Sequence, residues 1–395
     1  MKPLKEAPLT FDINQANGAV KKLWSKRMQG VITELSVSQN GKAILVGTYP
    51  DPDIPTSVGH HLLSRFDPIS GRRVWSKVLK SQVKAQAISH DASLAVISNY
   101  GDEIMGINAR GDMVWVQDGM CKPIILNSPR KVVCYHDDDA EPNVAFDVYS
   151  WDGEKLLSFP IVDDILALKK SDDEQSLAMA LTRGQVVLIE TRQFHAVWQT
   201  RVPGEVLDVD ASEGDHPRVA VLFSNLEGKQ EIALFDSDAH LIARGLPTLH
   251  AQQIEIAPSG EGVMTYGNST HGQYLAYFAL PKGENLLEEK WKRADPRGAD
   301  YSSSISVLPD SVFMGFEDVR EFTRHSHLLA FDFEGGLRWN IPLITEEGAY
   351  LYAQGSAQQG AVIAVGTDDA FLSVYHLSRE ASGQINPAGP KLSGN

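Results

Sequence analysis

The stretch Leu62–Leu79, LLSRFDPISGRRVWSKVL, predicts two short strands around a tight turn. The first strand covers Leu62–Asp67, the turn is residues 68–71, and the second strand carries Trp75 and ends at Leu79. Apolar, aromatic and β-branched residues favour strands, whereas Pro, Ser and Gly favour turns. The same pattern recurs along the whole chain, so it indicates a repeat protein.

One residue, about four positions after each turn, marks every copy of the pattern. We call these residues the anchors, and they are separated by 40 to 51 residues. They are Trp24, Trp75, Trp115, Leu157, Trp198, Ile242, Trp291 and Trp339. Six of the seven tryptophans of the chain are anchors, which random placement does not explain. The strands that precede the anchors are equally apolar, and they cover residues 62–67, 103–108, 144–149, 186–191, 232–237, 274–280 and 328–333.

A second hairpin lies between each anchor and the next such strand. It consists of an alternating strand, a polar turn and a small apolar strand, as in residues 32–48 (ITELSVSQNGKAILVGT). The other copies cover residues 84–98, 122–135, 165–181, 205–223, 253–267, 303–316 and 350–366. Each repeat therefore has four antiparallel strands, which we name a to d. A four-stranded unit of 40–50 residues is typical of a β-propeller blade.

The count of hairpins predicts an all-β chain with eight blades, or seven if one hairpin is miscounted. The last hairpin is followed by one strand, residues 371–377, and no anchor strand follows it. The N-terminal strand Val20–Met28 supplies the missing member, so the ring closes by pairing the two ends of the chain. We expect a lead-in at residues 1–19, one propeller domain at 20–378 and a disordered tail at 379–395.

The repeat resembles the PQQ-like (quinoprotein alcohol dehydrogenase-like) repeat and is similar to the WD40-like repeat. Leu62–Leu79 and Leu328–Leu343 carry the resemblance best, with a Gly-containing turn and a Trp four residues after it. The resemblance implies eight blades with the Trp side chains packed between them. The family contains quinone-dependent dehydrogenases, which have calcium-binding acids and adjacent cysteines. It also contains non-catalytic scaffolds of about this size, such as the Bam-type outer-membrane assembly lipoprotein.

The charge of the chain limits its partners. The 395 residues carry a net charge of −15, which argues against sequence-independent nucleic-acid binding and against docking on anionic membranes. No run approaches 18 apolar residues, and the N-terminus has no apolar segment of a signal peptide. We therefore expect a monomeric, cytoplasmic protein, or a periplasmic one if a leader was removed.

Two cysteines, Cys121 and Cys134, flank the hairpin turn at residues 127–130. They lie on neighbouring predicted strands, so they are expected to be close. Buried free thiols are the favoured interpretation, and a disulfide is the alternative. The spacing fits no zinc pattern.

The longest connections join strands b and c, and they concentrate on one face of the predicted ring. They are residues 49–61, 136–143, 224–230, 268–273 and 317–326. Long loops on a rigid scaffold are where binding residues usually lie. We therefore predict a partner-binding surface that includes Tyr49, Asp51, Asp53, His60, His61, Asp137, Asp138, Asp139, His271, Glu317, Arg320, Phe322 and His325.

The histidines of these loops could form a metal site across the ring, namely His60, His61, His325 and His327, but no metal-binding spacing on one element supports it. Residues 137–139 with Glu141 form an oxygen-rich cluster suited to calcium, but they match no EF-hand loop. Solvated side chains are the favoured interpretation of both. Tyr49, Tyr100 and Phe322 are either aromatic residues that contact a partner or residues that pack within the protein. No nucleophile elbow, P-loop or G-x-G-x-x-G motif is present.

The sequence thus predicts a non-enzymatic scaffold that binds a protein partner and needs no cofactor. The alternative is a propeller enzyme of the quinone- and calcium-dependent dehydrogenase type. Inward-pointing acids with an Arg or Lys around the central axis would favour the enzyme.

Overall fold

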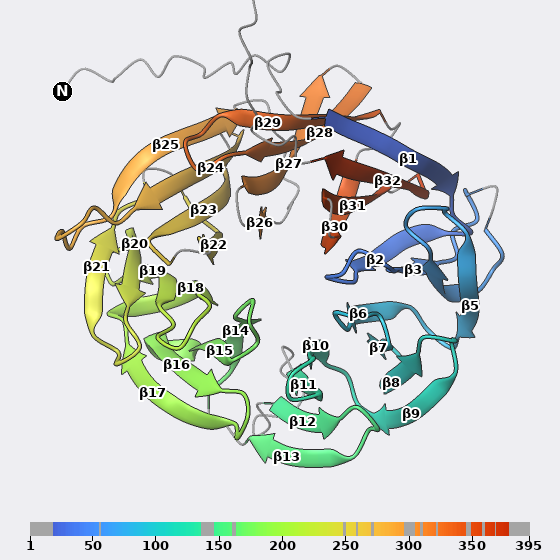
Figure 1. The fold of residues 1–395 in the computed structure, drawn as a ribbon, viewed down its shortest axis with the longest axis horizontal. Coiled ribbons are helices and arrows are strands. Elements are labelled where there is room, and N and C mark those ends of the chain that lie inside the picture. Colours follow the sequence, from blue (N-terminus) through green and yellow to red (C-terminus); the bar gives the residue numbers. More distant parts are fainter. Residues whose placement is uncertain are drawn as a thin grey trace, which may run out of the picture.

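The computed structural model describes residues 19–54, 57–135, 146–159, 163–247, 250–257, 260–269, 272–295, 305–308, 311–320, 323–344, 349–357, 360–367 and 369–378. These residues form eight four-stranded antiparallel sheets arranged as blades around one axis (Figure 1). The predicted eight-bladed β-propeller is confirmed.

Blades one to four follow one another along the chain, each running from the axis outward. Blade one contains β2 (Val31–Val37), β3 (Ile44–Tyr49), β4 (His61–Phe66) and β5 (Arg73–Leu79). Blade two contains β6 (Val83–Ile88), β7 (Leu94–Asn99), β8 (Glu103–Asn108) and β9 (Met113–Asp118). Blade three contains β10 (Lys122–Leu126), β11 (Lys131–Tyr135), β12 (Phe146–Ser150) and β13 (Lys155–Phe159). Blade four contains β14 (Ile165–Lys170), β15 (Ser176–Leu181), the 3-10 turn η2 (Thr182–Gly184), β16 (Gln185–Glu190) and β17 (His195–Arg201).

The other half of the ring continues in the same order. Blade five contains β18 (Gly204–Ala211), β19 (Val219–Asn225), β20 (Gln230–Phe235) and β21 (Leu241–Gly245). Blade six contains β22 (Gln253–Ile256), β23 (Gly262–Ser269), β24 (Gly272–Ala279) and β25 (Glu288–Asp295). Blade seven contains β26 (Ile305–Leu308), β27 (Ser311–Arg320), β28 (Thr323–Phe331) and β29 (Leu337–Ile344). Blade eight contains β30 (Ala349–Ala357), β31 (Gly360–Thr367), β32 (Phe371–Ser378) and β1 (Ala19–Arg27).

The first and last described strands of the chain meet in blade eight, as the sequence predicts. Strand β1 pairs with β32 in antiparallel register from Ala19 opposite Ser378 to Arg27 opposite Phe371. Figure 1 shows the blue N-terminal strand on the outside of the red C-terminal strands. This pairing removes the open edge that would otherwise separate the first and last blades.

The hydrophobic core lies between neighbouring blades. Alternating side chains of the middle strands point to the two faces of each sheet, so each blade contributes to two core clusters. One cluster joins Leu188 of blade four to Val209 and Val221 of blade five. Another joins Leu372 and Val374 of blade eight to Val46 and other residues of blade one.

The anchors occupy one structural position in the outer strands. Each stands opposite its partner directly beyond a β-bulge, as Trp75 does opposite Arg65 and Trp198 opposite Leu188. One prediction was wrong, because in blade five this position belongs to Ala243 and not to Ile242. Ala243 pairs with Leu234, and the bulge lies between Leu234 and Phe235. The same bulge recurs in the other blades, so it is the large apolar side chain of Ile242, and not the bulge, that makes this residue resemble an anchor.

Four anchor tryptophans bind the next blade in the same way, and we call these contacts Trp–Gly junctions. The indole nitrogen donates a hydrogen bond to a carbonyl in the next c–d turn, and the indole ring packs on a glycine of that turn. The four pairs of indole and glycine are Trp24 with Gly71, Trp75 with Gly111, Trp115 with Gly153 and Trp291 with Gly335. The predicted packing of Trp between blades is therefore present at these four junctions.

We expect Gly153→Ala to lower the free energy of unfolding by about 3 kcal/mol. A Cβ at this position would lie 2.4 Å from Trp115, and the backbone φ of +82° is unfavourable for Ala. Gly228→Ala is the control, because its φ is +76° but nothing lies within 4 Å of the added Cβ. Its expected cost is about 1 kcal/mol. Urea unfolding of both variants measures the difference, and equal losses would contradict the packing role of Gly153.

Three of the predicted b–c insertions are shorter than expected. The strands of blade five extend to Asn225 and resume at Gln230. In blade six, Ser269 pairs with Gly272, and in blade seven, Arg320 pairs with Thr323. These segments continue the hairpin ladder, because their residues still alternate and pair across two strands. Blade one keeps a long b–c connection, at residues 50–60.

Candidate functional site

We call the face that carries the b–c connections the b–c face, and the opposite face, with the a–b and c–d turns, the turn face. The blade-one connection on the b–c face is held by its own backbone. Asp51 accepts a hydrogen bond from the Asp53 amide (2.9 Å), and the Ile54 amide donates to the Asp51 carbonyl (3.1 Å). Ile54 is buried in the core between blades eight and one. The described residues of this connection expose Asp53 and His60.

The remaining predicted site residues are distributed unevenly. Tyr49 is half-buried at the end of β3, and His61 begins β4. Glu317, Arg320 and His325 belong to the long hairpin of β27 and β28. The others lie outside the described residues, and they are Asp137, Asp138, Asp139, His271 and Phe322.

Large apolar side chains are exposed on the b–c face, and sequence analysis missed most of them. Tyr100 is 59% exposed in the b–c turn of blade two, and Leu226 is 91% exposed in that of blade five. Val58 in blade one and Leu246 after β21 are exposed on the same face. A Leu at the tip of a polar turn is a signal that the sequence does contain, because turns favour Gly, Asn and Asp.

The candidate histidine metal site does not form among the described residues. His60 is exposed, whereas His327 lies with its Nδ1 2.9 Å from Oδ1 of Asn340 in the neighbouring strand. Within the described ranges, the one group of three metal-capable side chains is Asp236, Asp238 and His240, in an exposed turn on the turn face.

The predicted pair of thiols is present as two buried free cysteines. Cys121 precedes β10, and Cys134 lies in β11. Burial raises the pKa of the Cys121 thiol, and the nearby Cys134 raises it further. The two side chains thus act as small apolar groups in the core between blades two and three.

A charged network joins the inner strands of three consecutive blades. Lys169 of β14 donates hydrogen bonds from its Nζ to Asp208 Oδ2 of β18 (2.8 Å) and to Glu255 Oε1 of β22 (3.1 Å). Its third acceptor is the Ile254 carbonyl, at 2.8 Å. Figure 1 shows β18 between β14 and β22 on the inner side of the ring, so the contacts of Lys169 span three neighbouring blades.

Two aspartates of β18 complete this network. Asp208 accepts a hydrogen bond from the Ile254 amide and Asp210 one from the Ile256 amide, both at 2.8 Å. They cap amides on the free edge of β22, where a backbone donor without a partner would be costly. The alternation of Asp208, Val209 and Asp210 places both carboxylates on one side of the strand, a sequence signal that we did not use.

The network shifts the pKa values of its members. Burial raises the pKa of Asp210 and of Glu255, and Lys169 opposes this rise in both. Burial would lower the pKa of Lys169, but Glu255, Asp208 and Asp210 outweigh burial and raise it. The ammonium therefore stays charged and compensates the buried acids.

The residue types of this network are those that the enzyme alternative requires, but the acids do not form a group of calcium ligands among the described residues. Within the described ranges, the carboxylates of Asp208, Asp210 and Glu255 do not converge as a metal-ligand group. Lys169 lies where a cation would lie, and the backbone amides of β22 occupy Asp208 and Asp210. The network joins blades four, five and six.

A second acid of an inner strand, Glu34 of β2, stays protonated up to a higher pH than an ordinary glutamate. Burial raises its pKa to about 7, and Lys122 acts in the opposite direction. The folded protein therefore binds one proton more than the unfolded chain between about pH 4.5 and pH 7. Stability conferred by the protonated form falls as the pH rises through this window.

We expect Glu34→Gln to stabilise the protein by about 1–3 kcal/mol at pH 8 and to change little at pH 4. The amide cannot ionise, so the cost of a buried carboxylate disappears. Urea unfolding across this pH range measures the effect. Glu205→Gln, an exposed residue of β18, is the control. An equal gain in both variants, or a gain at pH 4, would contradict the role of burial.

Comparisons with known proteins support the fold alone. No protein-family model matches the chain, and no curated protein matches it in sequence. Among solved structures, BamB from Moraxella catarrhalis is 13% identical, with a TM-score of 0.56 over 92% of this chain and 100% of that chain. Sqt1 from Saccharomyces cerevisiae is 9% identical, with a TM-score of 0.65 over the same shares. The β-propeller domain of Cps50 (Swd1) from Myceliophteria thermophila is 8% identical, with a TM-score of 0.55 over 90% and 99%.

These similarities agree with a WD40-like propeller fold. The described residues include no helix that is long and apolar enough to cross a membrane.

Proposed function

We propose that this chain is a non-catalytic scaffold that binds a protein partner through its b–c face. The observation that carries the proposal is the exposure of Tyr100 and Leu226 on two connections of a closed ring. Exposed aromatic and aliphatic side chains on rigid supports act as anchors that a partner buries. Asp53 and His60, exposed in the blade-one connection, extend the same face.

Support also comes from the fold itself. Closing a ring of eight blades leaves the connections held by buried strands on both sides. A partner that binds such a surface loses little free energy to ordering of the scaffold. Propeller proteins of similar architecture are commonly used for interactions, and the proposed role agrees with this.

The experiment is an affinity capture that compares two variants of the b–c face with one control variant of the turn face. Tyr100→Ser and Leu226→Ser remove the exposed apolar groups of the b–c face. Ile69→Ser, 64% exposed on the turn face, is the matched control. We expect a specific partner to be retained by the control and depleted at least about tenfold by the b–c variants. A partner profile that is identical for all three variants would contradict the proposal.

We further propose that the repeat is of the PQQ-like type. The Trp–Gly junctions support this assignment, because they follow the turn and Trp spacing on which the resemblance rests. The type of repeat is a statement about ancestry and not about quinone binding, which the inner network does not favour.

A further inference from the structure

The contact between blades four and five departs from the Trp–Gly junctions. Trp198 is present as the anchor, but Ala239 stands in the next turn where the junctions have glycine. Ala239 keeps the turn geometry, with a φ of +65° and its amide bonded to the Asp236 carbonyl. At the four junctions a Cβ on the glycine would lie 2.4 to 2.8 Å from the indole. The methyl group of Ala239 therefore excludes that docking, and Trp198 Nε1 has no hydrogen-bond partner among the described residues.

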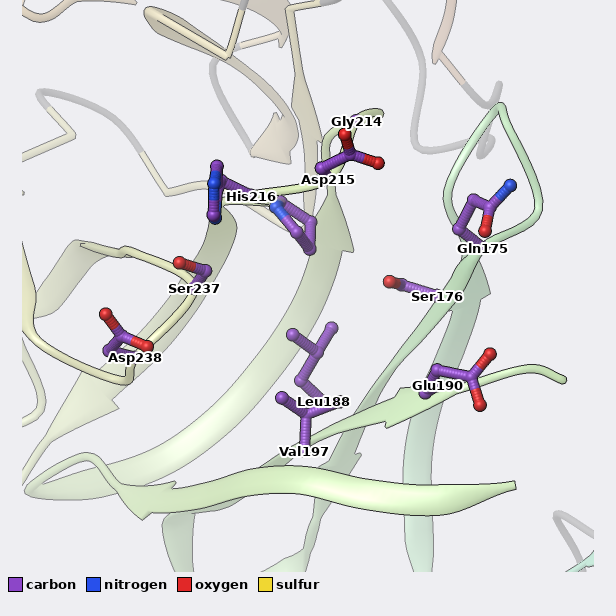
Figure 2. Close-up of a pocket in the computed structure, with 11 residues that line it drawn as sticks. Gln175, Ser176, Leu188, Glu190, Val197, Gly214, Asp215, His216, Ser237 and Asp238 are labelled. Carbon is purple, nitrogen blue, oxygen red and sulfur yellow. The ribbon is translucent and has the colours of Figure 1, made fainter. Parts of the chain in front are cut away.

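A cleft of about 340 Å³ opens on the turn face beside this contact. Figure 2 shows Ser237 and Asp238 on one side, Gln175, Ser176 and Glu190 on the other, and Leu188 and Val197 between them. The turn after β18 closes a third side and is labelled at Gly214, Asp215 and His216. The cleft thus has an apolar floor and a polar rim.

The rim of the cleft is acidic. Glu190, Asp215 and Asp238 line the cleft, and none of the described residues that line it is Lys or Arg. Asp215 has no ion pair or hydrogen bond within the described part of the chain. Just outside, burial raises the pKa of Glu213, and Asp172 and Asp173 raise it further, which reports a negative potential at this edge. An added positive charge would therefore be attracted to the rim.

We propose that this cleft takes an arginine or lysine side chain from an extended segment of a basic partner. The aliphatic stem would lie on Leu188 and Val197, and the cationic head would lie at the rim beside Asp215. Glu190 and Asp238, on the other two sides, would add negative potential. Basic side chains combine these two properties, because their stems bury apolar surface while their heads stay near charge. The net charge of −15 attracts a basic partner to the protein as a whole, and the cleft is the position at which one of its side chains would bind.

The site is independent of the proposed function, because it lies on the turn face and not on the b–c face. Tyr100→Ser and Leu226→Ser are therefore expected to leave it unchanged. If the b–c face binds no partner, the affinity capture fails while the cleft still binds a basic side chain. If the cleft binds no basic side chain, the peptide assay fails while the affinity capture is unchanged.

The test uses two labelled peptides that differ in one side chain, with arginine in one and its neutral isostere citrulline in the other. Fluorescence anisotropy at about 150 mM salt measures both affinities, because this salt screens diffuse surface attraction. We expect the arginine peptide to bind the full chain about tenfold tighter than the citrulline peptide. Asp215→Asn and Val197→Trp should each weaken the arginine peptide about fivefold or more, by removing a charge and by filling the cleft.

Asp152→Asn is the matched control, because Asp152 is an exposed acid in the blade-three turn of the same face. It should change the affinity less than about twofold, since it lies outside the cleft. Equal binding of the two peptides would overturn the proposal. So would an unchanged affinity in Val197→Trp, or a loss in Asp152→Asn as large as that in Asp215→Asn.

Discussion

Lys169→Met is expected to lower the free energy of unfolding by about 3–5 kcal/mol at neutral pH. The methionine removes three hydrogen bonds and leaves the buried Asp208 and the partly buried Glu255 near each other without a compensating cation. Removing one partner of a buried ion pair costs more than the pair itself contributes, because the remaining charge stays out of water. Urea unfolding at pH 7 measures the loss.

The pH dependence of this variant has a defined sign. The pKa values of Asp210 and Glu255 are already raised by burial, and loss of Lys169 raises them further. The acids then take up protons more readily when folded than when unfolded, so the deficit of the variant shrinks as the pH falls toward 4.

Lys229→Met is the matched control for charge removal. Lys229 pairs with Glu227 at 2.8 Å, and both side chains are largely exposed. The expected loss is below about 1 kcal/mol. Similar losses in Lys169→Met and Lys229→Met would show that the inner network does not hold blades four, five and six together.

Removal of residues 1–27 is expected to abolish the cooperative unfolding of the ring. The deletion takes away β1, which pairs with β32 along its whole length. It also exposes the edge of blade eight and the cluster around Leu372 and Val374. Losing about 5 kcal/mol or more would consume most of the stability of a typical protein.

Two comparisons separate ring closure from simple truncation. Removal of residues 1–18 leaves every described contact in place, so its melting temperature should equal that of the full chain. A synthetic peptide of residues 19–28, added to the shorter protein, should restore the transition by completing blade eight. A chain without residues 1–27 that melts like the full chain would contradict closure by β1.

The blade count and the closure were predictable because each blade repeats one spacing. Six tryptophans mark the anchor position in successive copies, and eight polar turns mark the a–b hairpins. Single-residue features were not predictable in the same way. The blade-five anchor is Ala243 and not Ile242, because pairing with β20 sets this position and the type of residue there does not.

The binding surface was predicted less well than the fold. Long polar stretches suggested loops in blades six and seven, but pairing across the hairpins continues through them, and in blade five it extends to Ser224 and Gln230. Strand length depends on partners that are distant in sequence, so composition alone misses it. The inner network depends likewise on three inner strands that are separated in sequence and meet only in the ring.

The central claim, that the b–c face binds a protein partner, is tested most directly by site-specific photo-crosslinking in cells. A photoreactive residue is placed at Tyr100, at Leu226 or, on the opposite face, at Ile69, and the adducts are identified by mass spectrometry. The account predicts one shared heavy adduct from positions 100 and 226 and its absence from position 69. Adducts that are absent at both b–c positions, or equally strong at position 69, would contradict it.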